Sequence, residues 1–452
     1  MTLEDKVHLP LLYISYPTVS LGDPQEPALD IFADVLGGSA SSMLYQSLVK
    51  TGKAIEVGAS HSCEELACTL AVYAYPNPAV DGSLKTLKGE VDKVIGEFAQ
   101  RGIKPADLEK AISSYRASAI WGLDSIEGKV SQLAMGQVLT RDPNYVFKNL
   151  DAISQVNAQQ VKAAYDKFIA NRHSVVLSVV PKGKTQWQAG TPNFTPAKRE
   201  LPDYSQHGEP LVQQTIKDNF DRSAQPRTAE AVSVKVPAIW HGKLDKGIEI
   251  IGTRSDEIPA VSIMIALPGG IRAEGKGELG LASLTAAMLG QGTARLSEAE
   301  LSDELQKLGA SISVSTAQYN NLITISSLTD KLPQTLALVR EVLLQPGLRE
   351  ADFERLKAQT LQGMKQSEQQ PEWLAGQAFR ELVYGEQNRL GQPTDGVLTD
   401  VEKLTLADVK RFYHAYYNPT NAKVVVTGDV TQQQVEQQLG FLTEWQGAAP
   451  TL

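Results

Sequence analysis

Three groups of residues in this sequence could carry out chemistry by type and spacing, and the sharpest is a glycine-rich segment. Gly275-Lys-Gly-Glu-Leu-Gly280 is a literal G-x-G-x-x-G between a predicted strand and a predicted helix, where a dinucleotide would place its phosphates. The strand is predicted to end near Leu267, so the tight strand-to-helix turn is missing, and an antiparallel hairpin follows where a parallel strand is required. A nucleotide-binding enzyme that uses Gly275–Gly280 is therefore kept only as a remote alternative.

The two cysteines and a pair of adjacent carboxylates are the other two groups. Cys63 and Cys68 lie five residues apart on a predicted strand, and an odd separation turns their side chains to opposite faces of a sheet. We expect two small buried thiols that do not pair with each other. Glu64 and Glu65 are neighbours at the end of the strand and face opposite ways, so we expect solvated carboxylates rather than an acid–base pair.

Histidines are few and scattered in this sequence. The six are His8, His61, His173, His207, His241 and His414. No two of them lie within four residues of each other, so no pair can share one turn of helix around a metal ion. We expect ordinary surface or capping roles. Another segment, Leu36–Ser42, is rich in Gly and Ser but lacks the Lys that follows in a phosphate-binding loop, and we interpret it as an interruption of a helix.

Composition and charge exclude two classes of partner. The 452 residues carry a net charge of -9 without a block of Lys and Arg, so a nucleic-acid backbone would meet mostly like charge. The chain has no apolar run near the ~20 residues that a membrane-spanning helix needs. Its first residues, Met1–Lys6, show no export signal. The compartment stays open between bacterial periplasm and cytoplasm, and an export signal would lie upstream of this chain.

An internal repeat organises the elements that must position any site. Residues 149–180 and 397–427 share one pattern, a turn, an N-capped helix and a β-branched strand, at a constant separation of 248 residues. Asn157 and Thr405 are the predicted N-caps. Residues 103–110 and 348–355 repeat at a separation of 245, and residues 48–52 and 305–309 at 257. Small changes in the separation are what insertions and deletions in loops produce.

We therefore predict an α+β fold of two homologous modules, each a mostly antiparallel sheet covered by helices. The first module spans residues 1–182, a long linker or hinge 183–237, and the second module 238–452. Predicted strands in the first lie near 7–16, 55–61, 66–75 and 174–180, with helices over 26–50 and from about 84, 105 and 157. In the second, strands near 248–252 and 261–267 precede helices over 278–289 and 297–308, a hairpin over 310–328 and further long helices.

The segment Gly280–Thr293 carries a family resemblance. Its sequence, GLASLTAAMLGQGT, resembles the signature of the insulinase/pitrilysin-type zinc peptidases, the inverted zincins. In that family Gly-Leu-Ala precedes His-x-x-Glu-His, whose histidines bind zinc while the Glu serves as general base to the metal-bound water. Ser283 and Ala287 stand at the ligand positions and Ala286 at that of the base. A further Glu ligand of the family falls near Gln362. The resemblance implies no catalytic residue and no metal ligand in this chain.

The resemblance covers nearly the whole chain. Residues 28–46 look like the opening of the family's second module, Phe220–Pro226 with 236–240 like its connector, and residues 416–430 like the strand and turn that close a metal-type module. An Arg and a Tyr seven residues apart assist at the reacting carbonyl in the family's fourth module. The aligned positions here are Leu48 and Ile55, and neither side chain can donate a hydrogen bond.

The order of these segments implies a specific place in the family's architecture. Its members resemble four such modules arranged as two halves of a clamshell around a peptide-holding chamber, with zinc in the first module. The chain is then the non-catalytic middle portion, modules two and three, of a zinc-dependent metallopeptidase that encloses and hydrolyses peptides. Zinc is expected only in the missing first module, and the partners are the peptide substrate and the missing first and fourth modules or a partner subunit. Substrate-contacting residues are not assigned. The alternative is a non-enzymatic scaffold or the inactive subunit of a heteromeric peptidase.

Overall fold

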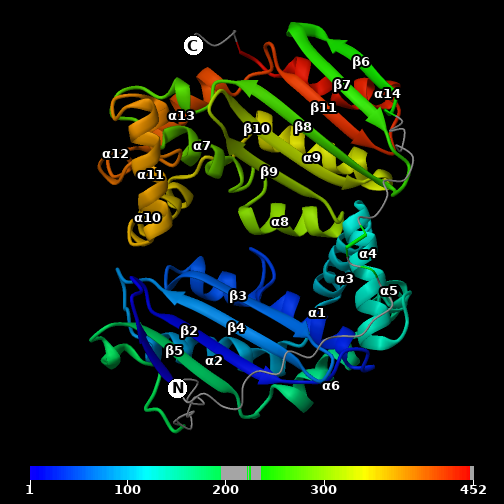
Figure 1. The fold of residues 1–452 in the computed structure, drawn as a ribbon, viewed down its shortest axis with the longest axis vertical. Coiled ribbons are helices and arrows are strands. Elements are labelled where there is room, and N and C mark those ends of the chain that lie inside the picture. The colour runs from blue at the N-terminus through cyan, green and yellow to red at the C-terminus, as the bar shows by residue number, and fades with distance from the viewer. Residues whose placement is uncertain (195–220, 222, 225–235, 448–452) are drawn as a thin grey trace.

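Two sheets, each backed by helices, stack one above the other (Figure 1). A computed structural model describes residues 1–194, 221, 223–224 and 236–447. We call the part built on the first sheet (residues 2–181) module one and the part built on the second (residues 239–444) module two. Most of the predicted linker 183–237, with most of the Phe220–Pro226 connector, lies outside the described residues.

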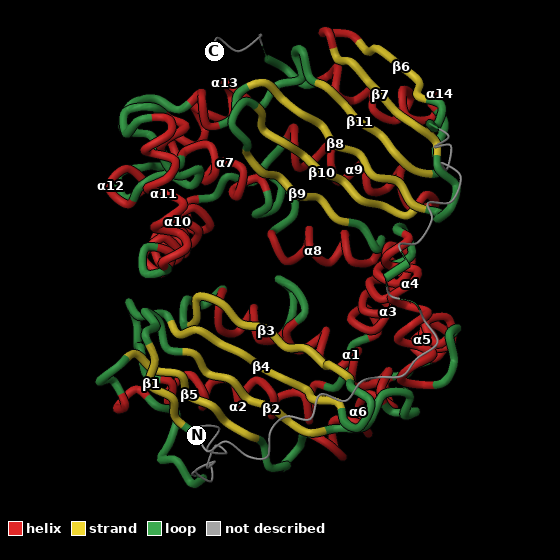
Figure 2. The backbone as a smooth tube through the Cα atoms, viewed as in Figure 1, coloured by secondary structure: helices red, strands yellow, loops and turns green. Residues whose placement is uncertain are grey.

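The sheet of module one has five strands in the order β1-β5-β2-β4-β3. Its strands are β1 (Thr2–Asp5), β2 (Leu11–Pro17), β3 (Ala54–Cys63), β4 (Cys68–Pro76) and β5 (Val175–Pro181). All neighbours are antiparallel except β1 and β5, which run parallel. The mostly antiparallel sheet that the sequence predicts is therefore confirmed, with β3 as a free edge on the side of module two (Figure 2).

The helices of module one cover one face of this sheet and extend toward module two. They are α1 (Glu26–Gly37), the π-type turn η1 (Tyr45–Val49), α2 (Leu84–Arg101), α3 (Pro105–Trp121), α4 (Ile126–Met135), the π-type turn η2 (Gly136–Thr140), α5 (Tyr145–Ser154), α6 (Ala158–Phe168) and the 3-10 turn η3 (Thr185–Trp187). Phe32, Phe98 and Tyr165 meet at the centre of the core, with ring centroids 4.8–5.5 Å apart.

The sheet of module two repeats this topology with one more strand, in the order β6-β7-β11-β8-β10-β9. Its strands are β6 (Ile239–Leu244), β7 (Ile248–Arg254), β8 (Ala260–Pro268), β9 (Ser311–Thr316), β10 (Asn320–Leu328) and β11 (Lys423–Gly428). The one parallel pair among them is β7 with β11, which occupies the place that β1 and β5 hold in module one.

Helices again cover one face of the sheet in module two. They are α7 (Leu281–Leu289), α8 (Glu298–Lys307), α9 (Leu332–Leu344), α10 (Glu350–Ser367), α11 (Pro371–Tyr384), α12 (Leu398–Val401), α13 (Leu406–Tyr416) and α14 (Gln432–Gln438). The 3-10 turns are η4 (Asp245–Gly247), η5 (Ile271–Ala273), η6 (Thr329–Lys331), η7 (Arg389–Gly391) and η8 (Leu439–Glu444). No helix in the described ranges combines the length and apolar character needed to cross a bilayer.

The predicted helix over residues 26–50 is interrupted where the Gly/Ser segment begins, as the sequence indicates. Helix α1 ends at Gly37, and a Cβ at that position would lie 2.3 Å from the backbone nitrogen of Ala59. Glycine thus lets the end of α1 touch strand β3 directly. Helical structure resumes before η1.

The prediction that Cys63 and Cys68 do not pair is wrong. They form a disulfide with their Cα atoms 4.0 Å apart. The two residues do not share a strand: Glu64–Ala67 form a turn, so Cys63 ends β3 and Cys68 begins β4 directly opposite it. Side chains opposite each other in an antiparallel pair lie on the same face. Glu64 and Glu65 are exposed in the turn, which confirms them as solvated carboxylates.

Candidate functional site

Helix α7 carries the signature segment, and a buried carboxylate fixes where it begins. Gly280 has a φ of +98° that allows the sharp entry, and the N–H groups of Gly280 and Ala282 donate to Glu274 Oε1 at 3.0 and 2.9 Å. Arg389 pairs with Glu274 Oε2 at 2.7 Å. Burial raises the pKa of Glu274, and the positive charge of Arg389 opposes that rise.

The hydrogen bonds of Glu274 argue against a nucleotide at Gly275–Gly280. A phosphate at Gly275–Gly280 would need the free amides at the start of α7, and Glu274 already accepts hydrogen bonds from two of them. Strand β8, which leads to the segment, runs antiparallel to both of its neighbours. A dinucleotide site requires a parallel strand there. The geometry therefore does not support nucleotide binding at Gly275–Gly280.

The three signature positions face two different surroundings. Ser283 and Ala287, one helical turn apart, line a cavity of about 380 Å³ between α7 and α10, whereas Ala286 is buried. The Ser283 hydroxyl donates to the backbone oxygen of Thr394 at 3.2 Å. Positions 283 and 287 thus lie on one face of the helix, where two ligands could reach one ion. Their side chains cannot serve as such a pair, because the Ser283 hydroxyl already has a hydrogen-bond partner and Ala287 has only a methyl group.

The opposite wall of this cavity comes from α10, and Gln362, expected near the further ligand position, is not part of it. Thr360, Gly363 and Ser367 face Ser283 and Ala287 across the cavity, whereas Gln362, predicted near the further ligand position, lines a different cavity between the modules. The lining offers hydroxyls, one thioether and a single carboxylate, that of Asp395. Zinc sites in proteins use Cys, His and carboxylate ligands in sets of three or four. The donor set does not fit zinc.

The positions aligned with the family's Arg and Tyr lie in module one. Leu48 is fully buried in η1. Ile55 stands at a register shift near the start of β3, half-buried, and its backbone oxygen accepts a hydrogen bond from Gln359 of α10 at 2.9 Å. Both positions are therefore occupied by apolar side chains: Leu48 belongs to the core of module one, and Ile55 lines a cavity between the modules.

A buried polar set that the sequence did not predict lies in module one. His61 Nδ1 is 2.6 Å from Asp30 Oδ1, and His61 Nε2 is 2.8 Å from Thr18 Oγ1. The three side chains come from β3, α1 and the segment after β2, too far apart in sequence for spacing to connect them. The His61 side chain has no exposed surface, so the set ties α1 to the sheet. Cys63 and Cys68 lie close to His61, but their sulfur atoms are bonded to each other and unavailable to a metal ion.

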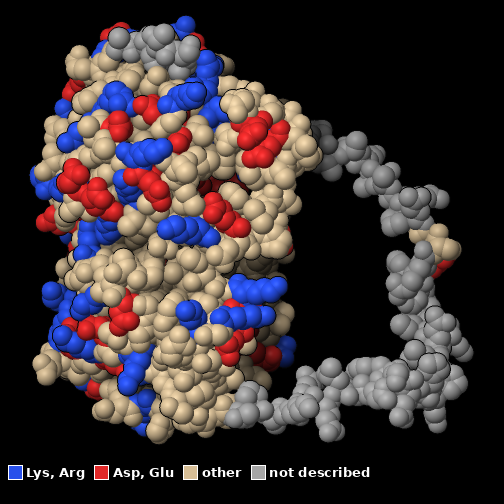
Figure 3. Space-filling view, turned by 90° about the vertical axis from the view of Figure 1, so that its left-hand side faces the viewer, with Lys and Arg blue, Asp and Glu red and all other residues tan. Residues whose placement is uncertain are grey.

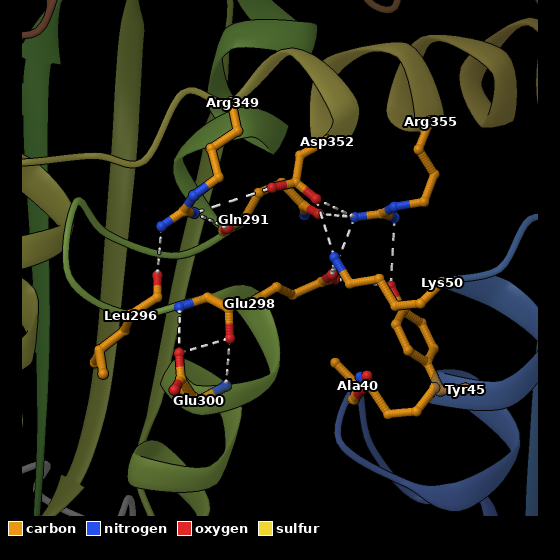
Figure 4. Close-up of polar contacts among 12 residues, drawn as sticks. Ala40, Tyr45, Lys50, Gln291, Leu296, Glu298, Glu300, Arg349, Asp352 and Arg355 are labelled. Carbon is orange, nitrogen blue, oxygen red and sulfur yellow. Dashed lines mark hydrogen bonds and ion pairs between the residues drawn. The ribbon is translucent and has the colours of Figure 1, made fainter.

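A polar network joins η1 of module one to α8 and α10 of module two (Figure 4). Tyr45 donates to Glu298 at 2.7 Å, and Arg355 donates to the Tyr45 hydroxyl oxygen at 3.3 Å. Lys50 pairs with Glu298 at 2.7 Å and with Asp352 at 3.0 Å. Burial, and then the adjacent Glu298 carboxylate, raise the pKa of Tyr45. The modules are thus held together by charged groups largely removed from solvent.

The surface seen from the side of α10 to α13 has mixed charge. Lys and Arg side chains are interspersed with Asp and Glu over this face rather than gathered into one basic area (Figure 3). With a net charge of -9, this face offers none of the one-signed positive field that attracts a phosphate backbone.

Comparison with protein families finds two profiles. The profile described as the peptidase M16 inactive domain matches residues 2–115 and 403–450, and that of insulinase, peptidase family M16, matches residues 250–394. A solved structure, the peptidase M16 inactive domain from Pseudomonas fluorescens, superposes with a TM-score of 0.45 at 24% identity, covering 48% of this chain and 52% of that chain.

Curated relatives match over parts of the chain. The non-peptidase homologue YmxG of Helicobacter pylori is 23% identical over 47% of this chain and 50% of its own length. An uncharacterized zinc protease of Streptomyces coelicolor, so named, is 26% identical over 36% of this chain and 35% of its own length. The beta subunit of the mitochondrial-processing peptidase of Saccharomyces cerevisiae is 19% identical over 47% and 46%. The chain spans about half the length, or less, of these relatives.

Proposed function

Because the chain belongs to the M16 family of insulinase-like peptidases as a non-catalytic member, we propose that it is the middle portion of a zinc-dependent peptidase that encloses and hydrolyses peptides. The observation that carries the proposal is α7: the family's ligand frame is kept, but Ser283, Ala286 and Ala287 replace its ligands and base. In this proposal zinc and the general base come from a first-type module outside this chain.

Two features support a place beside catalytic modules. The chain contains two copies of the same module. The inactive-domain profile matches part of module one and the end of module two, and the insulinase profile matches much of module two. It spans only part of the length of its relatives, among them a protein named as an uncharacterized zinc protease. The proposal assigns this chain the chamber wall and the joint between the halves, and it assigns the chemistry to the missing modules.

Metal analysis and a peptidase assay test the proposal together. We expect the purified chain to hold no stoichiometric zinc and to leave a fluorogenic peptide uncleaved. The same peptide should be cleaved after the chain is combined with the product of the upstream reading frame that encodes His-x-x-Glu-His. Mutating the first His of that motif is the control and should abolish the activity. One tightly held zinc per isolated chain, or peptide cleavage by it, would overturn the proposal.

The second candidate function is a non-enzymatic scaffold or the inactive subunit of a heteromeric peptidase. The similarity to a non-peptidase homologue over half of that protein's length favours it. The neighbouring reading frames distinguish the two candidates. A His-x-x-Glu-His motif encoded in frame about one module upstream supports the middle-portion proposal, a separate neighbouring gene with the motif supports the inactive subunit, and no motif in either place supports the scaffold.

A further inference from the structure

The two modules contact each other through equivalent helices. Lys110 on α3 and Arg355 on α10 lie 245 residues apart, at the separation that relates these helices in the sequence repeat. Each reaches the other module: Lys110 pairs with Asp303 at 2.5 Å, and Arg355 donates to Tyr45 at 3.3 Å. The same contact between a long helix and the partner module is therefore made twice.

The first contact, between α3 and α8, is closed, and apolar side chains pack there beside the ion pair of Lys110 with Asp303. A Cβ on Gly309 would lie 2.7 Å from the Cβ of Ala117, so the two backbones touch with no space between them. Ala117 is buried in a cluster with Ile258, Ala260 and Leu328 of module two. The partly buried Ile120, Trp121 and Leu123 pack against this cluster.

The second contact, between α10 and the start of β3, is open and polar. Gln362 stands in place of Ala117, and Gly52 in place of Gly309. A Cβ on Gly52 would meet no atom within 4 Å. A cavity of about 560 Å³ occupies this space between the modules. Cavities of this size at a junction of domains are the usual setting of binding sites for small ligands.

The lining of this cavity combines apolar walls with two polar groups that lack partners. The apolar part is Val49, Ala54, Ile55, Ala79, Ala351, Ala358 and Leu361. Gln362 also lines the cavity, and its side-chain oxygen is buried without a hydrogen-bond partner. An unsatisfied buried acceptor costs free energy until a donor reaches it. Lys365 is half-buried in the lining and has no ion pair among the residues that the structure places.

The other charges at the cavity cancel one another. Lys50 and Arg355 share the carboxylates of Glu298 and Asp352, at N–O distances between 2.7 and 3.3 Å (Figure 4). The two carboxylates match the charges of Lys50 and Arg355, while Arg349, 4.0 Å from Asp352 and outside the cavity lining, adds one further positive charge to the network. The ammonium group of Lys365 is then the charge in the lining that remains to be matched. A ligand for this cavity has to bring one negative charge, one hydrogen-bond donor and an apolar group.

We propose that the cavity between α10 and β3 binds the C-terminal residue of a peptide. The terminal carboxylate pairs with Lys365, the backbone N–H of that residue donates to the orphan oxygen of Gln362, and its side chain packs against the apolar walls. This binding needs neither zinc nor another module, so it is measured on the chain alone and stands apart from the proposed place in a peptidase.

A pair of peptides tests the proposal on the intact wild-type chain. The probes are two alanyl-alanyl-leucine peptides with the same fluorophore attached to the N-terminal amine, one with a free terminal carboxylate and the other with a terminal amide. Anisotropy should show that the acid binds at least about tenfold more tightly, because the amide cannot make the charge-assisted bond to Lys365. Equal binding of the two peptides, or no binding of either, would refute the site.

Two variants and a matched control complete the test. Lys365→Met should remove the preference for the acid, and Gln362→Leu should weaken both peptides by a similar factor while the preference persists. Lys410→Met replaces an exposed lysine on α13, outside the cavity lining, and should bind both peptides as the wild type does. A preference that survives Lys365→Met, or is lost in Lys410→Met, would count against the assignment.

Discussion

At the scale of single residues, Glu274 shows how one buried side chain can decide where a helix begins. Its carboxylate accepts hydrogen bonds from the first amides of α7 and forms an ion pair with Arg389. The Glu274 side chain has no exposed surface. Helix N-termini favour negative charge for the same reason that they favour capping oxygens. The carboxylate therefore performs both functions for the helix that carries the signature.

Replacing this carboxylate should be costly. We expect Glu274→Ala to lower the free energy of unfolding by about 3–5 kcal/mol, because it leaves the largely buried Arg389 unpaired and the helix amides without an acceptor. Glu278→Ala is the matched control, since Glu278 lies four residues away and pairs with Arg411 at side-chain exposures of 32% and 56%. Glu278→Ala should lower the free energy of unfolding by less than about 1 kcal/mol. Urea unfolding followed by circular dichroism measures both, and similar losses would show that Glu274 has no special role.

The residues at the candidate site differ in how far the sequence could predict them. Ser283, Ala286 and Ala287 were identifiable because the signature is local, and α7 places them on the faces that a helix dictates. The Asp30–His61 pair could not be predicted from the sequence, because the two residues come from α1 and β3 and meet only once the sheet has formed. Spacing within one element predicts neighbours, whereas contacts between elements depend on how the chain folds back.

At the scale of elements, the hairpin β3–β4 also shows that spacing in the sequence does not predict contacts between two elements. Taken as one continuous strand, Cys63 and Cys68 face apart, but a turn between them puts the two residues opposite each other. The short edge strands β1 and β6 escaped prediction because neither has a sustained apolar pattern. Where the pattern was strong the prediction held: Asn157 and Thr405 are the N-caps of α6 and α13, each in a capping box.

The disulfide gives an element-scale prediction. Cross-linking residues 63 and 68 closes a short loop in the unfolded chain, and the loss of chain entropy corresponds to about 2 kcal/mol of stability. The double variant Cys63→Ser/Cys68→Ser should lose about that amount in urea unfolding under oxidising conditions. A reductant should lower the wild type to the level of the variant and leave the variant unchanged. A wild type that reductant does not affect would contradict the prediction.

At the scale of the whole molecule, the sequence repeat predicted two similar modules but not how they dock. The ion pair between Lys110 and Asp303 joins residues 193 positions apart. Surface charges such as these carry no periodic pattern before the modules meet. The docking follows instead from a closed contact at α3, which combines apolar packing with one ion pair, and from an ionic contact at α10.

The glycines at the two contacts provide a matched pair of variants. Both Gly309 and Gly52 have positive φ, +58° and +74°, so Ala at either position should cost about 1–2 kcal/mol in backbone strain. Gly309→Ala should lose about a further 1–3 kcal/mol, because the new methyl group collides with Ala117 at the closed contact. Its radius of gyration in small-angle X-ray scattering should also rise, whereas that of Gly52→Ala should not. Equal stability losses with unchanged radii would mean that the closed contact does not hold the modules together.

The doubled contact of α3 and α10 resembles the contact of a symmetric dimer within one chain. When two copies of one surface touch each other across a twofold axis, each residue meets its partner twice, as in an isologous homodimer. Lys110 and Arg355 hold equivalent positions, and their partners Asp303 and Tyr45 lie one position apart in the repeat, because Asp303 corresponds to Gln46. Because the two modules belong to one chain, their two contacts need not be identical: the one at α3 is closed, whereas the one at α10 holds a cavity.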